Sequence, residues 1–182
     1  MKLVNKKPFL LYVGNAFPHK NLERLIIAFK KIKEQKPNLN LILVGEIDYF
    51  YKRIKKLSKE LNIKSIYFTG RVSDKDLNFL YKNAELYIFP SLEEGFGLPG
   101  LEAMNNNLPV ICSKATSLPE IYEEAAVYFN PKDVYNIYKS ILNLLNDKSK
   151  QKELIQEGQK QINKYSWDKC AKETLNIYNS LK

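Results

Sequence analysis

Two glutamates flank a glycine-rich turn in the middle of the chain. Glu94 and Glu102 lie eight positions apart within the segment FPSLEEGFGLPGLEAM, residues 89–104. A carboxylate can accept hydrogen bonds from two neighbouring hydroxyls at once, as the acidic residue of dinucleotide-binding folds does from a ribose. A carboxylate at position 102 therefore suits a vicinal diol, whereas Glu94 is expected to stand at the mouth of the turn.

The residues between the glutamates favour a loop that turns directly into a helix. Gly95 and Gly97 allow the backbone to approach a ligand closely, and Pro99 suits the first turn of a helix. We expect the helix to cover residues 98–105, with Glu102 about one turn inside it. The free amides of its first turn would face an anion such as a phosphate.

Short apolar runs alternate with helical patterns along the chain, which predicts an α/β fold. The apolar runs suit strands buried on both faces, and the segments between them carry apolar residues at helical spacing. This alternation implies a Rossmann-like, doubly wound parallel sheet with flanking helices, formed by one domain over residues 1–182. The C-terminal part, about residues 133–182, is expected to be helical, with Ser166 capping its last helix. The expected strands cover residues 9–13, 41–44, 65–69, 86–89, 109–112 and 126–129.

Five loops leave the carboxyl ends of these strands and carry most of the polar residues of interest. They cover residues 14–20, 45–46, 70–72, 91–94 and 113–120. Ligands of open α/β sheets bind at this edge, near the point where the strand order reverses. We therefore expect the five loops to form one site.

Two basic side chains in these loops could neutralise a diphosphate. Lys20 stands one residue before a predicted helix, whose N-terminus carries partial positive charge, and Arg71 follows the third strand. The alternative for Lys20 is one more solvated surface lysine. His19, the one histidine, is interpreted as a loop residue rather than a catalytic base.

The composition and the N-terminal residues predict neither a secreted nor a membrane-spanning protein. The hydrophobic content of 45% supports a sizeable core, and no apolar run approaches the roughly 20 residues needed to cross a bilayer. The N-terminus lacks the apolar core of a signal peptide, which predicts a cytoplasmic protein. Cys112 and Cys170 lack metal-type spacing, and both are predicted to be buried thiols.

The net charge of +9 has three interpretations. Most lysines decorate the outer faces of predicted helices, which indicates a solvated surface. The excess could also favour an anionic substrate or a negatively charged membrane face. Nucleic-acid binding is not predicted, because no basic stripe interleaves with exposed aromatics in a known motif. No cluster of carboxylates or histidines indicates a metal site.

Five segments resemble the retaining nucleotide-sugar glycosyltransferases of the GT-B fold, glycosyltransferase family 4. The spacing of the two glutamates lies in EEGFGLPGLEA, and the other segments are LYVGNAFPHKNLERLIIAF, LILVGE, FTGRVSDKDLNFLYKNAELYIFPS and LPVICSKATSLPEIYEEAAVYFNP. The likeness covers nearly the whole chain. It implies the C-terminal, donor-binding half of a GT-B fold.

The resemblance assigns roles to the loop residues. Lys20 would neutralise the leaving diphosphate, Glu94 would contact the hydroxyls of the donor sugar, and Glu102 would hold the ribose. Many relatives have an arginine where this chain has Asn15, so phosphate binding would rest more on Lys20, with Arg71 or His19 as a further contact. Retention implies attack from the front face, assisted by the leaving phosphate, and protein cations would take the place of a metal. Lys20 and Glu94 are thus the candidate catalytic residues; the candidate donor-binding residues are Asn15, Arg71, Val72, Gly95, Phe96, Gly97, Leu98 and Glu102.

The donor implied by the resemblance is a nucleotide diphosphate sugar, used to transfer a hexose or related sugar into a surface polysaccharide. Relatives have an N-terminal domain that binds the acceptor, and this chain corresponds only to the donor half. We expect that domain to act in cis or in trans, with a lipid-linked acceptor or peripheral contact with the inner face of the membrane. The alternatives are a non-catalytic nucleotide-sugar-binding module and a GT-B sugar epimerase, and the glutamate spacing favours the transferase over the epimerase.

Overall fold

One six-stranded parallel sheet forms the centre of the protein, and the computed structural model describes residues 6–181. The strands are β1 (Phe9–Val13), β2 (Asn40–Val44), β3 (Ile66–Phe68), β4 (Leu86–Phe89), β5 (Val110–Ser113) and β6 (Ala126–Phe129). They lie in the order β3-β2-β1-β4-β5-β6, so the order reverses between β1 and β4. This order confirms the predicted Rossmann-like, doubly wound architecture.

The central strands form where continuous apolar runs are buried from both sides, whereas the edge strands β3 and β6 are only partly buried. β1 reads FLLYV, and its first four residues are buried. It pairs in parallel with β2 on one edge and with β4 on the other, so that Leu10 lies beside both Leu41 and Leu86. All six predicted strands are confirmed, with ends that differ from the prediction by at most one residue.

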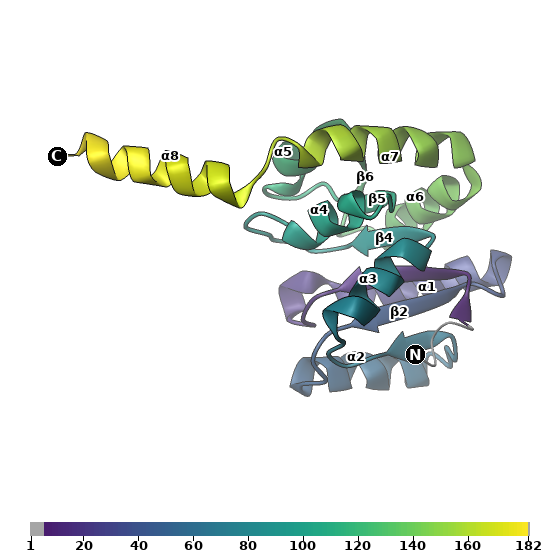
Figure 1. The fold of residues 1–182 in the computed structure, drawn as a ribbon. Coiled ribbons are helices and arrows are strands. Elements are labelled where there is room, and N and C mark those ends of the chain that lie inside the picture. The colour runs from purple at the N-terminus through teal and green to yellow at the C-terminus, as the bar shows by residue number, and fades with distance from the viewer. Residues whose placement is uncertain (1–5, 182) are drawn as a thin grey trace.

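Helices cover both faces of the sheet (Figure 1). They are α1 (Leu22–Gln35), α2 (Tyr49–Glu60), α3 (Asp74–Asn83), α4 (Leu98–Asn105), α5 (Leu118–Tyr122), α6 (Val134–Asn146) and α7 (Lys148–Ile162), with the short 3-10 helices η2 (Pro18–Lys20) and η3 (Glu123–Ala125). In Figure 1, α3 and α4 lie in front of the sheet, whereas α1 and α6, which pack together, lie behind it. Within the described part of the chain, no helix is long and apolar enough to cross a membrane.

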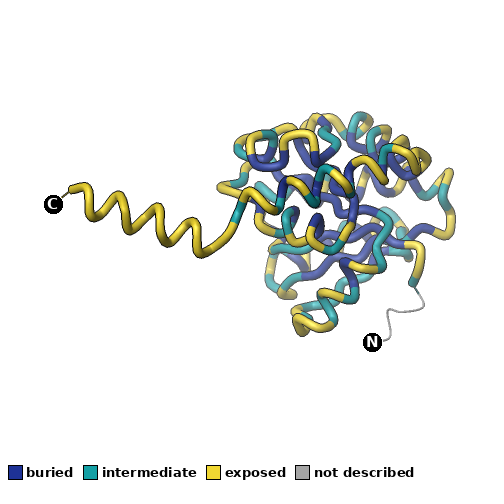
Figure 2. The backbone as a smooth tube through the Cα atoms, turned by 45° about the horizontal axis from the view of Figure 1, so that its top comes forward, coloured by how far each residue is buried: buried dark blue, intermediate teal, exposed yellow. Residues whose placement is uncertain are grey.

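The last helix, α8 (Trp167–Ser180), projects away from the rest of the domain (Figures 1 and 2). Every residue of this helix is exposed, and Trp167 and Tyr178 are 77% and 65% exposed. The Ser166 Oγ accepts from the backbone N–H of Lys169 over 3.1 Å, which confirms the predicted cap. The apolar stripe of α8 therefore packs against no other part of residues 6–181.

The two cysteines lie in opposite environments. Cys112 is buried in β5, and burial raises the pKa of its thiol. Cys170 lies on α8 and is exposed. The prediction that both are buried is therefore right for Cys112 and wrong for Cys170. Helical spacing shows that a helix has an apolar face, but it does not supply an element to cover that face.

Candidate functional site

The reversal of strand order brings the loops after β1 and β4 together. The two strands are adjacent and parallel, so the segments that follow them leave the same edge of the sheet. The backbone N–H of Leu92 donates to the carbonyl of His19 over 2.7 Å, which joins the two loops directly. The edge at which a ligand is expected is therefore built by the loops that carry Lys20 and Glu94.

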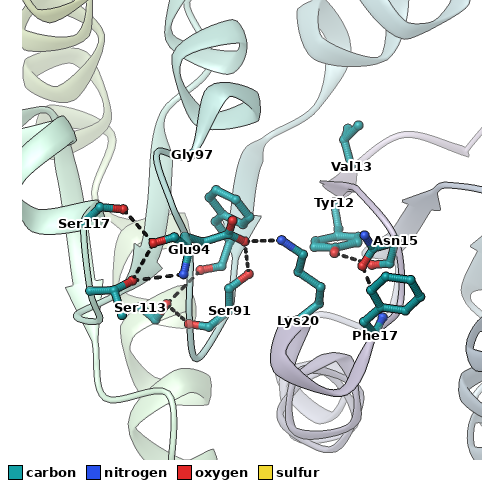
Figure 3. A network of polar contacts seen from close by, with 12 residues as sticks. Tyr12, Val13, Asn15, Phe17, Lys20, Ser91, Glu94, Gly97, Ser113 and Ser117 are labelled. Atoms are coloured by element: carbon teal, nitrogen blue, oxygen red, sulfur yellow. Dashed lines mark hydrogen bonds and ion pairs between the residues drawn. The ribbon is translucent and has the colours of Figure 1, made fainter.

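Lys20 and Glu94 form an ion pair across these two loops (Figure 3). The Lys20 Nζ lies 2.6 Å from the Glu94 Oε1, and the two side chains are 14% and 10% exposed. The ammonium also lies 5.9 Å from the centre of the Phe89 ring. A charge-assisted contact of this length, partly shielded from water, holds both groups in defined positions. The two candidate catalytic residues, 74 positions apart in sequence, are thus in direct contact.

Hydroxyl groups hold the loop that carries Glu94. The Ser91 Oγ donates to the Glu94 Oε1 over 2.6 Å. From the loop after β5, the Ser117 Oγ donates to the Glu94 carbonyl over 3.0 Å, as Figure 3 shows. In the same loop, the Thr116 Oγ1 accepts from the Glu94 backbone N–H over 3.0 Å. The sequence placed residues 113–120 at this edge, but their role in holding Glu94 was not predicted.

Gly97 allows the chain to turn from this loop into α4. Its φ is 93°, in the region that favours glycine, and it directly precedes the helix. A Cβ at this position would lie 2.4 Å from the Tyr122 hydroxyl oxygen and 2.8 Å from the Leu118 Cδ2. The Tyr122 hydroxyl instead donates to the Gly97 carbonyl. The short helix α5 therefore fixes the start of α4 by packing against a bare backbone.

The rest of the turn faces solvent. Gly95 is exposed, and a Cβ there would meet no atom within 4 Å. Phe96 and Leu98 are 40% and 44% exposed, and the Phe96 ring lies edge-on to Tyr165 with 5.4 Å between the ring centres. A ligand could therefore reach residues 95, 96 and 98, whereas Gly97 is buried, and the assignment of these four residues to donor binding stays a prediction.

Glu102 lies on α4, where it contacts α3. Its Oε2 accepts from the Tyr81 hydroxyl over 2.9 Å. Burial and the negative charge of Glu102 raise the pKa of Tyr81, so this hydroxyl keeps its proton and remains a donor. Within residues 6–181, no hydrogen bond or ion pair joins Glu102 to Lys20 or Glu94. The two glutamates therefore have different surroundings.

The other candidate donor-binding residues lie in the loops after β1 and β3. Asn15 is exposed, and its Oδ1 accepts from the backbone N–H of Phe17 over 3.2 Å (Figure 3). Arg71 pairs with Glu46 over 2.6 Å, with side chains 81% and 63% exposed. Val72 is half-buried. Exposed ion pairs contribute at most about 1 kcal/mol, so Arg71 can leave Glu46 for another anion at little cost.

Two hollows of the surface lie apart from the central ion pair. One of about 140 Å³ opens between η2, α1 and α2, and one of about 430 Å³ opens between the end of α1 and the start of β3. Neither is lined by Lys20 or Glu94. Among the described residues, no group of three or more His, Cys, Asp and Glu side chains is placed to hold a metal ion. That the site works without a metal stays a prediction.

The sequence matches a known family over most of its length. Residues 2–161 match the family described as Glycosyl transferases group 1. The chain belongs to this family. One relative, the O-antigen chain mannosyltransferase B of Escherichia coli, is 36% identical over 178 residues. The match covers 95% of this chain and 46% of the relative, so the chain spans about half the length of that relative.

Solved glycosyltransferases of the GT-B fold superpose on the domain. The sucrose-phosphate synthase of Thermosynechococcus elongatus does so with a TM-score of 0.87 and 28% identity, over 98% of this chain and 46% of that one. Anabaena Alr3699/HepE, in complex with UDP and glucose, has a TM-score of 0.86 and 19% identity, over 98% of this chain and 50% of that one. At 19% identity the likeness shows the fold alone. The chain thus has the C-terminal-like, Rossmann-like half of a GT-B fold, as the sequence predicted.

Proposed function

We propose that this chain is the donor-binding domain of a retaining glycosyltransferase that uses a nucleotide diphosphate sugar. The observation that carries the proposal is the contact between Lys20 and Glu94 at the point where the strand order reverses. A cation and a carboxylate 2.6 Å apart suit the two sides of the bond that breaks, a phosphate on one side and a sugar on the other. Membership of the group 1 family supports the proposal.

Lys20 binds the diphosphate in this proposal. When the bond between the sugar carbon and the phosphate oxygen breaks, negative charge grows on the leaving diphosphate. An ammonium already held in place stabilises this charge more in the transition state than in the ground state. Arg71 supplies a second cation, since its exposed pair with Glu46 opens at little cost.

Glu94 contacts the hydroxyls of the donor sugar, and Glu102 contacts those of the ribose. The Lys20 Nζ and the Ser91 Oγ both bond the Oε1 of Glu94, which leaves its Oε2 to accept from sugar hydroxyls. The exposed residues Gly95 and Phe96 and the N-terminus of α4 offer backbone amides to the phosphates. Each end of the donor then has its own set of contacts.

The transferred sugar is a hexose in this proposal, with mannose as the first candidate. This choice is supported by the relative named O-antigen chain mannosyltransferase B, and it places the reaction in the assembly of a surface polysaccharide. The acceptor is bound by an N-terminal domain in cis or in trans. A cytoplasmic location and a lipid-linked acceptor at the membrane face belong to the same proposal.

Calorimetric titration with UDP, GDP, ADP and their sugars tests the donor site. At least one should saturate the chain, and Lys20→Ala should weaken the diphosphate by about tenfold or more, since a charged hydrogen bond contributes about 1.5 to 3 kcal/mol. Lys31→Ala is the charge-matched control, because Lys31 is an exposed residue of α1. Saturation by none of these nucleotides, or an equal loss in the two variants, would refute the donor site.

A transfer assay separates a transferase from a non-catalytic binding module. Holding the acceptor hydroxyl close to the anomeric carbon supplies on the order of 7 to 11 kcal/mol of barrier reduction when ideal. We therefore expect negligible transfer by residues 1–182 alone and transfer when an N-terminal domain is fused or supplied. Robust glycosylation by the lone chain would contradict this division of labour, and no transfer by the two-domain form would favour the module.

A further inference from the structure

Asn21 is a buried polar residue. From the sequence, nothing more could be said of it than that it stands at the start of a helix. It lies between η2 and α1 with a φ of 58°, in the left-handed region, and is 4% exposed. Asparagine adopts this conformation more readily than most residues. Its side chain makes no capping hydrogen bond to the first turn of α1. The hydrogen bonds of the amide go elsewhere.

The Asn21 side chain ties together three loops that are distant in the sequence. Its Nδ2 donates to the carbonyl of Pro90 over 3.0 Å and to that of Pro131 over 2.8 Å. Pro90 follows β4, and Pro131 follows β6. The Arg24 Nη1 donates to the Asn21 Oδ1 over 2.9 Å. Both sides of the amide are therefore bonded, which fixes its orientation.

The loop after β1 is joined to the loop after β4 on both sides of Lys20. On one side, the carbonyl of His19 accepts from the backbone N–H of Leu92. On the other side, the Asn21 amide donates to the carbonyl at position 90. The Lys20 ammonium, carried by the residue between these two attachments, contacts the carboxylate at position 94. The backbone that carries Lys20 is thus pinned immediately before and after it.

We propose that Asn21 is a positioning residue that holds the Lys20 ammonium where the diphosphate of the donor binds. The inference rests on the proposed function, because it assigns Lys20 to the diphosphate. Lysine has a long flexible side chain, so its ammonium keeps one place only if the backbone beneath it is fixed. A buried amide supplies that rigidity, because a movement of Asn21 would leave buried carbonyls without partners. Because Asn21 is only 4% exposed, it acts on the donor through Lys20 rather than by contacting the donor itself.

Acetylation of Lys20 by an activated ester, followed by mass spectrometry, measures its position without any nucleotide. In the unaltered protein, Lys20 should react more slowly than the exposed Lys31, because its ammonium is paired and shielded. Asn21→Gly keeps the left-handed backbone without strain but removes the amide. We expect Lys20 to react about tenfold faster in this variant, relative to Lys31, and by a similar factor in Glu94→Gln.

Gln151→Leu is the matched control. Gln151 is also a buried amide that donates to two carbonyls, those of Leu144 and Leu145, but it lies where α6 meets α7. This substitution should lower thermal stability and leave the reactivity of Lys20 unchanged. An equal rise in Gln151→Leu would overturn the assignment, since it would show that any loosening of the fold exposes Lys20.

Arg24→Met keeps the test decisive if Asn21→Gly does not fold. It leaves the Asn21 amide in place but removes the bond that orients it, while a similar stem still covers the surface. We expect a smaller rise in Lys20 reactivity in the same direction. Unchanged reactivity of Lys20 in every folded variant of Asn21 and Arg24 would overturn the proposal.

Nucleotide affinities give a second readout that loss of folded protein does not imitate. The ratio of the affinities for UDP and UMP, and likewise for GDP and GMP, reports the contribution of the second phosphate. Asn21→Gly should lower this ratio to that of Lys20→Ala, and the double variant should lower it no further. An equal fall in both affinities would count against positioning. If the unaltered chain binds no nucleotide, the proposed function fails, whereas the acetylation experiment still decides whether Asn21 positions Lys20.

Discussion

Replacing Glu94 by glutamine separates the two partners of the central ion pair. A diphosphate that binds Lys20 competes with the Glu94 carboxylate, which lies 2.6 Å from the ammonium. Glu94→Gln keeps the shape of the side chain and an oxygen that can accept from Ser91, but it removes the charge. We therefore expect the variant to bind a bare diphosphate equally well or more tightly. The nucleotide sugar should lose the extra affinity that contacts between its sugar and Glu94 provide.

The burial of the pair sets the expected magnitudes. Exposed ion pairs contribute about 0 to 1 kcal/mol, whereas removing one partner of a fully buried pair costs about 3 to 5 kcal/mol. With side chains 14% and 10% exposed, this pair lies between the two cases, so the free energy of unfolding should fall by about 1 to 3 kcal/mol. The extra affinity of the nucleotide sugar over the bare diphosphate should fall by about tenfold or more.

Calorimetry with one diphosphate and its sugar, together with urea unfolding, measures both quantities. Glu93→Gln is the control, because Glu93 is the exposed neighbour and its substitution changes the net charge by the same amount. It should leave stability and both affinities unchanged. If Glu94→Gln weakens the bare diphosphate as much as the nucleotide sugar, Glu94 does not act on the sugar, and the competition with Lys20 described above is wrong.

Three further predictions concern Glu102, Gly100 and the two cysteines. Glu102→Gln should weaken the bare diphosphate and the nucleotide sugar alike, by about 1 to 3 kcal/mol in the same titrations, because the ribose is common to both. Gly100→Ala should lower the free energy of unfolding in urea by about 1 to 3 kcal/mol, because the added Cβ would lie 2.2 Å from the hydroxyl oxygen of the buried Tyr122. A thiol reagent should label Cys170 in the native protein, and Cys112 only after unfolding, because burial raises the pKa of Cys112 and blocks access. Rapid labelling of native Cys112 would contradict its burial in β5.

The strands were predictable because each is a short run of mostly apolar residues, and the central strands are buried on both faces. Such a run can be recognised without knowing which elements pack beside it, and β1 and β4 were located within one residue for this reason. The short helix α5 was missed, because five residues do not reveal a helical period. The exposure of Cys170 was missed, because the covering of a helix face depends on the rest of the fold.

Some features of the candidate site were also predictable from the sequence, and others were not. Lys20 and Glu94 stand out in sequence through their types and the glycines and helices beside them. Their contact could not be derived from the sequence, because it depends on β1 and β4 becoming neighbours. Asn21 could not be found at all from local patterns, since its partners at positions 90 and 131 are backbone carbonyls. Any residue type can supply a carbonyl, so the sequence leaves no mark of such a bond.

The isolation of α8 divides the molecule into two units of unequal local stability. Its 14 residues are held by their own backbone hydrogen bonds and the Ser166 cap, and helices of this length are marginal in water on their own. Amides of α8 should therefore exchange with solvent almost as fast as those of a peptide, whereas amides of β1 and β4 should exchange only through global opening. Whatever comes to cover Trp167 and Tyr178 would slow that exchange along the whole helix. Hydrogen exchange in this one element thus reports directly on what α8 meets.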